Sequence, residues 1–376
     1  MRIALFTGNY NYVREGANQA LNRLVTYLES AGHAARVYSP VTDTPAFEPA
    51  GTLIPVRSIR APFRGEFRAA LGLPRANRRD LRRFAPDLFH VTTPDLLGIR
   101  AQSFARRLGV PVVASFHTRF ETYLDYYGAG WARGLLEAHL RRFYRRSDLV
   151  LVPNQAILAE MSLLVGVERV RLWSRGVDHD LFSPMRRDPQ WRRAQGWQDD
   201  DVVLLFFGRL VREKGVDAYI ETVERLRVLG QDPRPLVIGA GPAAGRFERL
   251  SGALLTGHLQ DEILARAVAS ADLLLSASTT EAFGNVVLEA MASGLAVVSA
   301  DAPSARALIE DGVSGILSPP DPVRYAAVLG PLIEAPERRR KLAAAARAAS
   351  AAFDWDAASR SVELGYRDLL AGRLRR

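Results

Sequence analysis

Two glutamates on either side of a short apolar turn are the residues of this sequence best placed to do chemistry. Glu281 and Glu289 are separated by a turn that opens a run with helical spacing, 285–291. The apolar run 272–276 before them predicts a buried strand. Glu281 is therefore expected in the loop at the strand's carboxyl end, where open α/β sheets bind ligands, with Glu289 about two helical turns further on.

The turn between the glutamates predicts a seat for a diphosphate. A helix N-terminus presents backbone N–H groups and the positive end of the helix dipole to an anion. One carboxylate would then bind sugar hydroxyls and the other a ribose. The alternative is a capped helix with two solvated glutamates. The N–H groups concerned belong to Phe283, Gly284, Asn285 and Val286.

A second motif, 208–215, follows a predicted strand at 202–207 and supplies two cations. Arg209 and Lys214 would both face the carboxyl edge of the sheet. A diphosphate leaving group needs positive charge when no metal is present, and a guanidinium and an ammonium provide it. The alternative is a turn whose charges, 212–214, pair among themselves.

Three further segments of the second half give weaker indications of a nucleotide or metal contact. Gly241 lies in a glycine-rich turn whose spacing and Pro242 do not fit a dinucleotide fingerprint, so we expect a tight turn under the nucleotide. His258 ends another strand, and the backbone around it would bracket a base. The acidic run 199–201 has the spacing of metal-dependent sugar transferases, but it precedes a strand, so we expect a solvated turn.

In the first half, His117 and Gly16 are the candidate site residues. His117 follows a predicted strand at 112–116 in a position that faces a cleft, although a lone histidine is more often structural. Gly16 lies where the loop after the first strand enters a helix, and glycines there permit close approach of the backbone to a ligand.

Strand-like and helical runs alternate along nearly the whole chain, which predicts an α/β fold with two doubly wound parallel sheets. We expect domains at 1–180 and 181–354. The expected strands are 3–7, 35–39, 53–56, 88–92, 112–116, 149–152, 202–207, 236–238, 253–256, 273–276 and 296–299. The helices of the first half should begin near Gly16, Asn77, Pro94, Gly128 and Asn154.

Composition excludes some chemistry and leaves one question open. The 376 residues include no cysteine, which excludes disulfides and thiolate catalysis. No signal peptide or membrane-spanning run is evident, so we expect a cytoplasmic protein. Residues 1–180 hold 25 Arg against 16 Asp and Glu, whereas the remainder is balanced. This basic excess, concentrated in 57–83 and 141–146, fits an anionic membrane, nucleic acid or only a solvated face.

Taken together, four motifs resemble family 4 of the retaining glycosyltransferases, whose two-Rossmann-domain architecture is called GT-B. They are the turn from Glu281 to Glu289, the 208–215 loop, the loop at 115–118 and the segment 172–178. The last two look most similar to sulfolipid synthases and glycolipid α-mannosyltransferases of that family. One departure is Gly16-Ala17, where many members have a Gly-Gly pair.

The resemblance implies two domains facing a central cleft, with a C-terminal helix at 355–376 crossing back to the first. It implies a metal-independent, cofactor-free enzyme that moves a sugar from GDP-mannose or a UDP-hexose to a lipid or lipid-linked acceptor. His117 and Glu281 would contact the sugar, Glu289 the ribose, and Arg209 and Lys214 the diphosphate. We expect peripheral binding of the basic N-terminal domain to the inner face of the cytoplasmic membrane, and no nucleic acid. A nucleotide-sugar epimerase, a non-catalytic nucleotide-binding protein and a soluble acceptor stay open.

Overall fold

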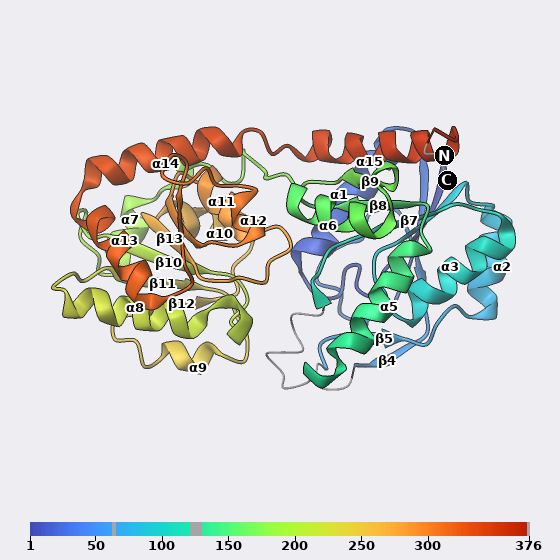
Figure 1. Ribbon diagram of the computed structural model, residues 1–376. Coiled ribbons are helices and arrows are strands. Elements are labelled where there is room, and N and C mark those ends of the chain that lie inside the picture. Colours follow the sequence, from blue (N-terminus) through green and yellow to red (C-terminus); the bar gives the residue numbers. More distant parts are fainter. Residues whose placement is uncertain (62–64, 121–129, 374–376) are drawn as a thin grey trace. The chain divides into compact units, whose positions relative to one another are not determined.

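A computed structural model describes residues 1–61, 65–120 and 130–373 (Figure 1). The described chain forms two compact units. The first unit comprises the described residues up to Arg175 together with those from Trp355 onward, and the second runs from Gly176 to Asp354. The chain therefore leaves the first unit before position 180 and returns to it for its last helix.

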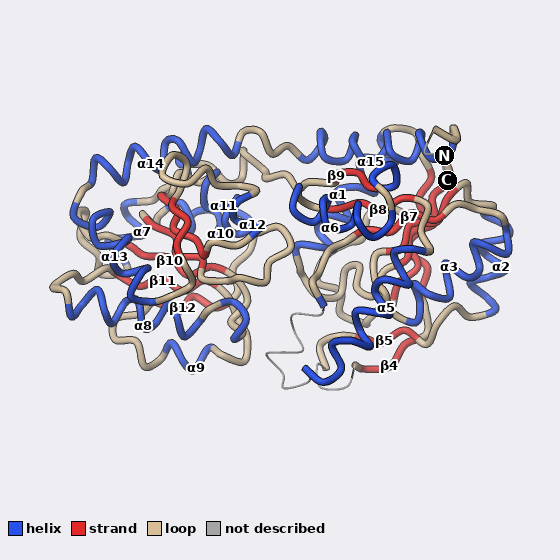
Figure 2. The backbone as a smooth tube through the Cα atoms, viewed as in Figure 1, coloured by secondary structure: helices blue, strands red, loops and turns tan. Residues whose placement is uncertain are grey.

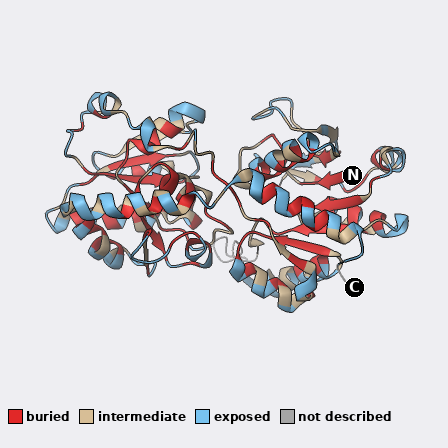
Figure 3. Ribbon diagram, turned by 90° about the horizontal axis from the view of Figure 1, so that it is seen from above, coloured by how far each residue is buried: buried red, intermediate tan, exposed pale blue. Residues whose placement is uncertain are grey.

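The first unit is built on a parallel sheet of seven strands in the order β3-β2-β1-β6-β7-β8-β9. Every residue of β6, β7 and β8 is buried, because helices cover both faces of a parallel sheet. Figure 3 shows these buried strands between helices whose outer sides are exposed. The strands are β1 (Arg2–Phe6), β2 (Ala34–Ser39), β3 (Thr52–Pro55), β6 (Leu88–Val91), β7 (Val112–Ser115), β8 (Leu149–Val152) and β9 (Val170–Leu172).

The helices of this unit follow the strands in turn, and a short antiparallel hairpin precedes α2. The helices are α1 (Gly16–Ser30), α2 (Arg75–Phe84), α3 (Leu96–Leu108), α5 (Arg133–Arg145) and α6 (Gln155–Val165), with 3-10 turns η1 (Gly130–Ala132) and η2 (Val167–Arg169). The hairpin consists of β4 (Ser58–Arg60) and β5 (Arg68–Ala70).

The last helix, α15 (Trp355–Leu370), completes the core of the first unit. It packs on α1, β8 and β9. Val362 and Tyr366 are fully buried there, and the Tyr366 hydroxyl lies 2.7 Å from Nδ1 of the buried His90. Glu363 accepts hydrogen bonds from Tyr27 (3.0 Å) and bonds to His33 (2.9 Å), so polar contacts as well as apolar ones hold the helix in place.

The second unit has a parallel sheet of six strands in the order β12-β11-β10-β13-β14-β15. Neighbouring residues of one strand, such as Leu204 and Leu205, belong to separate cores on the two faces of the sheet. The strands are β10 (Val203–Phe207), β11 (Arg234–Ile238), β12 (Leu254–Gly257), β13 (Leu273–Ser276), β14 (Ala296–Ala300) and β15 (Ile316–Ser318).

Helices enclose this sheet too, as the tube in Figure 2 shows. They are α7 (Pro189–Ala194), α8 (Val216–Val228), α9 (Ala244–Phe247), α10 (Asp261–Ala269), α11 (Asn285–Ala292), α12 (Pro303–Arg306), α13 (Pro322–Glu334) and α14 (Pro336–Ser350), with 3-10 turns η3 (Pro184–Arg186) and η4 (Arg212–Lys214).

The predicted fold class is confirmed, and all eleven predicted strands are present with ends shifted by a residue or two. The sequence analysis missed the short strands β9 and β15 and the β4–β5 hairpin. The helix expected near Asn77 begins at Arg75 and the one expected near Pro94 begins at Leu96. The predicted helix start at Gly128 lies outside the described residues, and the helix that follows begins at Arg133.

Each sheet has one place where its strand order reverses: between β1 and β6 in the first unit, and between β10 and β13 in the second. Ligands of open α/β sheets bind at the carboxyl ends of the strands at such a point, because the loops on either side turn in opposite directions and leave a crevice.

Candidate active site

Two of the residues predicted to bind the donor, Lys214 and Glu281, meet where β10 and β13 lie side by side. β10 leads into the loop that carries Arg209 and ends in η4, and β13 leads into the loop that carries Glu281 and ends at α11. Nζ of Lys214 and Oε1 of Glu281 form an ion pair, with 21% and 20% of the two side chains exposed. The fold thus joins two motifs that lie 67 residues apart in the sequence.

Close backbone packing explains why Lys214 lies next to this loop. Gly215 has a φ of +77°, and a Cβ there would fall 2.6 Å from Cβ of Ala277. The hydroxyl of Ser278 donates to the carbonyl of Glu213 at 3.1 Å. Only glycine permits this approach, so the turn after η4 is held against the end of β13.

The N-terminus of α11 is open to a ligand. Gly284 is its N-cap residue with a φ of +98°, and glycine has no side chain that could accept from the first-turn N–H groups. Phe283 points the other way: it is buried, and its ring lies 6.0 Å from that of Phe353. Phe283 therefore anchors the turn from inside, and its backbone with that of Asn285 and Val286 is what could face an anion.

Glu289 lies within α11 and is partly buried. Burial raises the pKa of its carboxyl to about 8. The carboxyl is therefore largely protonated at neutral pH, when it can both donate and accept a hydrogen bond. A ribose offers hydroxyls that do the same, so the group suits the predicted contact.

Close packing against Leu210 explains why position 241 is a glycine. The loop that contains it folds over Leu210, whose N–H donates to the carbonyl of Ala240 and whose carbonyl accepts from Ala243, both at 2.9 Å. A Cβ on Gly241 would fall 2.4 Å from the Leu210 carbonyl oxygen. The turn at Gly241 thus packs directly against the loop that carries Arg209, and it is tight, as predicted.

His258 is exposed and follows β12, which is separated from β10 by β11. It thus lies two strands from β10 at the carboxyl edge of the same sheet, and its contact with a base stays a prediction. In the acidic run, Asp199 pairs with Arg193 at 2.6 Å and Asp201 with Arg234 at 3.1 Å. Within the described ranges no group of three or more histidine and acidic side chains is arranged to hold a metal ion.

In the first unit, both ring nitrogens of His117 are engaged. Nε2 lies 2.7 Å from Oγ of Ser115, and Nδ1 lies 2.8 Å from Nη2 of Arg175. The ring of Trp173 meets the imidazole edge to face, with centroids 5.2 Å apart. Burial, the charge of Arg175 and, to a smaller extent, His90 lower the pKa of His117 well below its usual value.

Arg175 is the residue that the sequence analysis missed. Only 4% of it is exposed, its guanidinium lies 4.7 Å from the Trp173 ring centroid, and burial lowers its pKa to about 10. It falls within the 172–178 motif, where no role was assigned to it. The available signal was a basic residue directly before Gly176 in a motif that already carried the family resemblance.

Gly16 is the first residue of α1. Glu15 is the N-cap, and its N–H bonds Oδ1 of Asn18 at 3.0 Å in a reciprocal capping box. The side chains of Glu15 and Asn18 thus cap the N-terminus of α1, whereas the N-cap residue of α11 is Gly284, which has no side chain to cap it.

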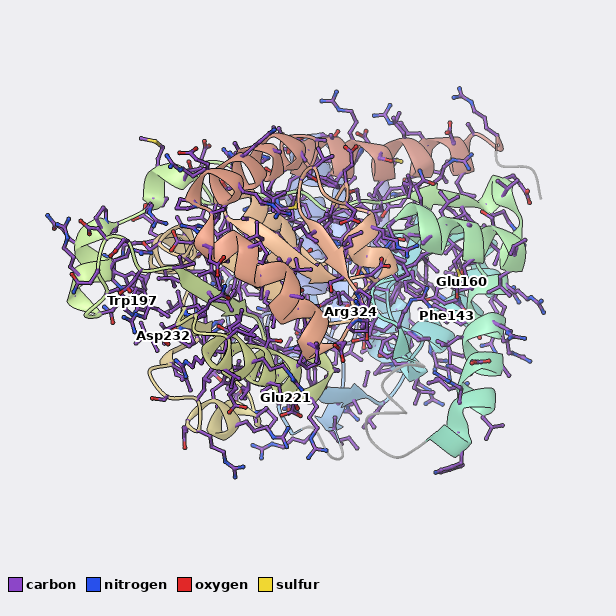
Figure 4. The ribbon with its side chains drawn as sticks, turned by 60° about the vertical axis from the view of Figure 1, so that its left-hand side comes forward. Phe143, Glu160, Trp197, Glu221, Asp232 and Arg324 are labelled. Carbon is purple, nitrogen blue, oxygen red and sulfur yellow. The ribbon has the colours of Figure 1, made fainter. Side chains whose placement is uncertain are left out.

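The basic face of the first unit carries exposed apolar side chains as well. Trp131 in η1 and Leu135 in the first turn of α5 are 84% and 73% exposed. Arg142 lies two turns beyond Leu135, and Phe143 (labelled in Figure 4) is buried on the inner side of the helix. In the part of the chain that the structure describes, no helix has the length and hydropathy to cross a membrane.

Comparison with known proteins identifies the family. Residues 14–181 match the family described as Glycosyltransferase Family 4, and residues 187–349 match Glycosyl transferases group 1. The chain is 30% identical to sulfoquinovosyl transferase SQD2 of Arabidopsis thaliana, with 96% of this chain and 72% of that one aligned. It is 33% identical to a GDP-mannose-dependent alpha-mannosyltransferase of Mycolicibacterium smegmatis, covering 99% and 98% of the two chains.

Two further similarities extend this result. Alpha-monoglucosyldiacylglycerol synthase of Streptococcus pneumoniae is 27% identical over 90% of this chain and 79% of its own. Sucrose-phosphate synthase of Thermosynechococcus elongatus has the same fold, with a TM-score of 0.80, 19% identity and 99% coverage of both chains. The fold is GT-B. The chain belongs to the glycosyltransferases of family 4 and group 1, and it is a transferase enzyme.

Proposed function

We propose that this glycosyltransferase moves a sugar from a nucleotide-diphosphate sugar to a lipid or lipid-linked acceptor, without a metal and with retention of configuration. The observation that carries the donor side is what the second unit presents where the strand order of its sheet reverses. There two cations, a carboxylate and an open helix N-terminus come from two loops at the reversal point of the sheet.

Each group has a task in this proposal. Arg209 and Lys214 neutralise the charge that grows on the leaving diphosphate, the part that a metal ion plays elsewhere. The N–H groups at the start of α11 bind the same diphosphate. Glu281 binds hydroxyls of the sugar, and Glu289 binds the ribose.

Retention follows when the acceptor attacks from the face that the diphosphate leaves. The leaving phosphate oxygen then takes the acceptor's proton as the new glycosidic bond forms, and no enzymic nucleophile is needed. Glu281 is held by Lys214 rather than presented as a nucleophile, which supports this route. In this proposal His117 of the first unit also contacts the sugar.

The lipid acceptor is supported by the name of one relative, a glucosyldiacylglycerol synthase, and by the surface of the first unit. Trp131 and Leu135 would enter the interface of the bilayer, and the arginines of α5 would bind anionic headgroups. The enzyme would act at the inner face of the cytoplasmic membrane. Donors are GDP-mannose or a UDP-hexose; the name of the mycolicibacterial relative favours the first.

The test is transfer from GDP-mannose, UDP-glucose and other nucleotide sugars to diacylglycerol vesicles or to a free polyol, with and without EDTA. We expect an α-linked lipid product from an α-linked donor, formed equally with the chelator present. Isomerised donor without transfer would point to an epimerase and overturn the proposal. Loss of activity in EDTA, restored by Mn²⁺, would overturn the metal-independent mechanism.

Membrane binding has a separate test. Vesicles with anionic lipid should retain the protein, and 1 M salt, where the Debye length is about 3 Å, should release it. The variant W131Q/L135Q should be retained less. L163Q is the matched control, because Leu163 is 93% exposed on α6 of the same unit. Retention that is independent of lipid charge would favour the soluble acceptor.

A further inference from the structure

Arg175 is a buried cation that has only neutral partners. Nη1 donates to the carbonyls of Trp173 (3.0 Å) and Ser174 (3.2 Å), and Nη2 bonds Nδ1 of His117 (2.8 Å). Among the described residues, no carboxylate lies within salt-bridge distance of it. A buried charge without a counter-ion destabilises a protein, so we expect Arg175 to have a function that a neutral residue would not perform.

The direction of the hydrogen bonds fixes the tautomer of His117. A guanidinium can only donate, so Nδ1 must be an acceptor without a proton. The single proton of the neutral ring is then on Nε2, from which it is donated to Oγ of Ser115 at 2.7 Å. The T-shaped contact with the Trp173 ring supports the imidazole in this orientation.

We infer that Arg175 is a positioning residue for the proposed transfer, holding His117 as a neutral imidazole whose Nε2–H is offered to a substrate oxygen. The inference rests on the proposed function, in which His117 meets the sugar. A hydroxyl of the sugar or acceptor takes the place of Ser115 Oγ as the acceptor of this hydrogen bond. His117 is then a hydrogen-bond donor and not a general base, because its only lone pair is covered by the guanidinium.

The other groups that surround His117 do not oppose this state. His90 on β6 is neutral: burial lowers its pKa to about 3, and it bonds Tyr366 of α15. Arg119, two residues after His117, pairs at 2.6 Å with Glu160 of α6, which is labelled in Figure 4. Glu160 is thus already paired with Arg119, and burial and the charge of Arg175 both keep the pKa of His117 low.

The direct test is NMR of the protein with ¹⁵N-labelled histidine, in which the H117Q variant assigns the resonance among six histidines. We expect the Nε2–H tautomer and no titration of His117 between pH 5.5 and 8. A Nδ1–H tautomer, or titration in that range, would overturn the inference. This measurement needs no substrate, so it stands whether or not the proposed function holds.

The kinetic test compares R175L with R175K. In R175L the imidazole loses its donor and the nearby charge, so its pKa can rise towards the ordinary value of about 6.5. The loss of kcat should then be up to about fourfold greater at pH 6 than at pH 8, because an imidazolium beside the sugar opposes the positive charge that develops there in the transition state. R175K keeps the charge and should keep a flat profile. Circular dichroism and Tm confirm folding; if R175L does not fold, the wild-type NMR decides. Identical pH profiles in wild type and folded R175L would overturn the positioning role, whereas E281Q tests the donor site independently.

Discussion

The Lys214–Glu281 pair leads to a prediction in which ligand binding and turnover change in opposite directions. In the unliganded protein each of these two residues neutralises the other. A nucleoside diphosphate without its sugar must separate them to reach Lys214, and it offers Glu281 nothing in return. The E281Q variant removes that obstacle, so we expect it to bind UDP or GDP more tightly while it loses sugar transfer.

The size of the gain follows from the burial of the pair. Exposed ion pairs contribute about 0.2–1 kcal/mol, and hydrogen bonds to charged groups about 1.5–3 kcal/mol. With about a fifth of each side chain exposed, the pair belongs between these classes, at about 1–2 kcal/mol. At about 1.4 kcal/mol per factor of ten, the affinity of E281Q for the diphosphate should rise about 5- to 30-fold.

Isothermal titration calorimetry with UDP and GDP measures this directly. E221Q is the matched control, because Glu221 is an exposed glutamate on α8 of the same unit (Figure 4), and its affinity should be unchanged. K214M should bind either diphosphate more weakly than wild type. If E281Q binds both nucleotides no more tightly than E221Q does, the pair does not guard the diphosphate site and the reasoning is wrong.

Three further outcomes are expected. R209A should keep its Tm but lose about 10²–10³-fold in kcat, since it removes a donor to the leaving group; near-normal turnover would remove it from the site. E289Q should act mainly on donor KM. Burial raises the folded pKa of Glu289 from 4.5 to about 8, so the wild-type protein loses stability as this carboxyl becomes charged at rising pH. The Tm of E289Q relative to that of wild type should therefore increase from pH 5 to pH 9. E363Q should be less stable than wild type by about 2 kcal/mol at pH 7, because the hydrogen bond from His33 holds the folded pKa of Glu363 near 2 against 4.5 in the unfolded chain. This difference in stability should shrink as the pH falls from 5 to 2. A difference in stability that does not change with pH would contradict the prediction.

The sequence predicted the central strands well because a strand buried on both faces is an apolar run that cannot be mistaken for a surface helix. It failed at β9 and β15, each three residues long, which form the ends of their sheets. Two of the three residues in each of these edge strands are only partly buried, and Arg171 and the buried Ser318 interrupt runs that are already short, so the apolar signal is lost.

The candidate site was predicted as far as the fold rules allow. Loops that follow parallel strands end at one edge, so the meeting of the Arg209 and Glu281 loops could be expected. Which side chains touch there could not, because the Lys214–Glu281 pair depends on the turn at Gly215 packing against Ala277. The same holds for Arg175, whose contact with His117 joins segments 58 residues apart.

The return of the chain to the first unit for α15 has a consequence for how the protein is made. The sheet of that unit is complete once β9 has left the ribosome, yet the surface that Val362 and Tyr366 cover remains open until α15 has been synthesised. The second unit, whose described residues are the continuous segment Gly176–Asp354, can close its core first. The nascent first unit therefore exposes apolar surface while its neighbour folds, and it is the unit that needs protection from aggregation. For chimeras that exchange the second unit with a relative's, the junctions belong at Arg175/Gly176 and Asp354/Trp355, which leave α15 with its own sheet.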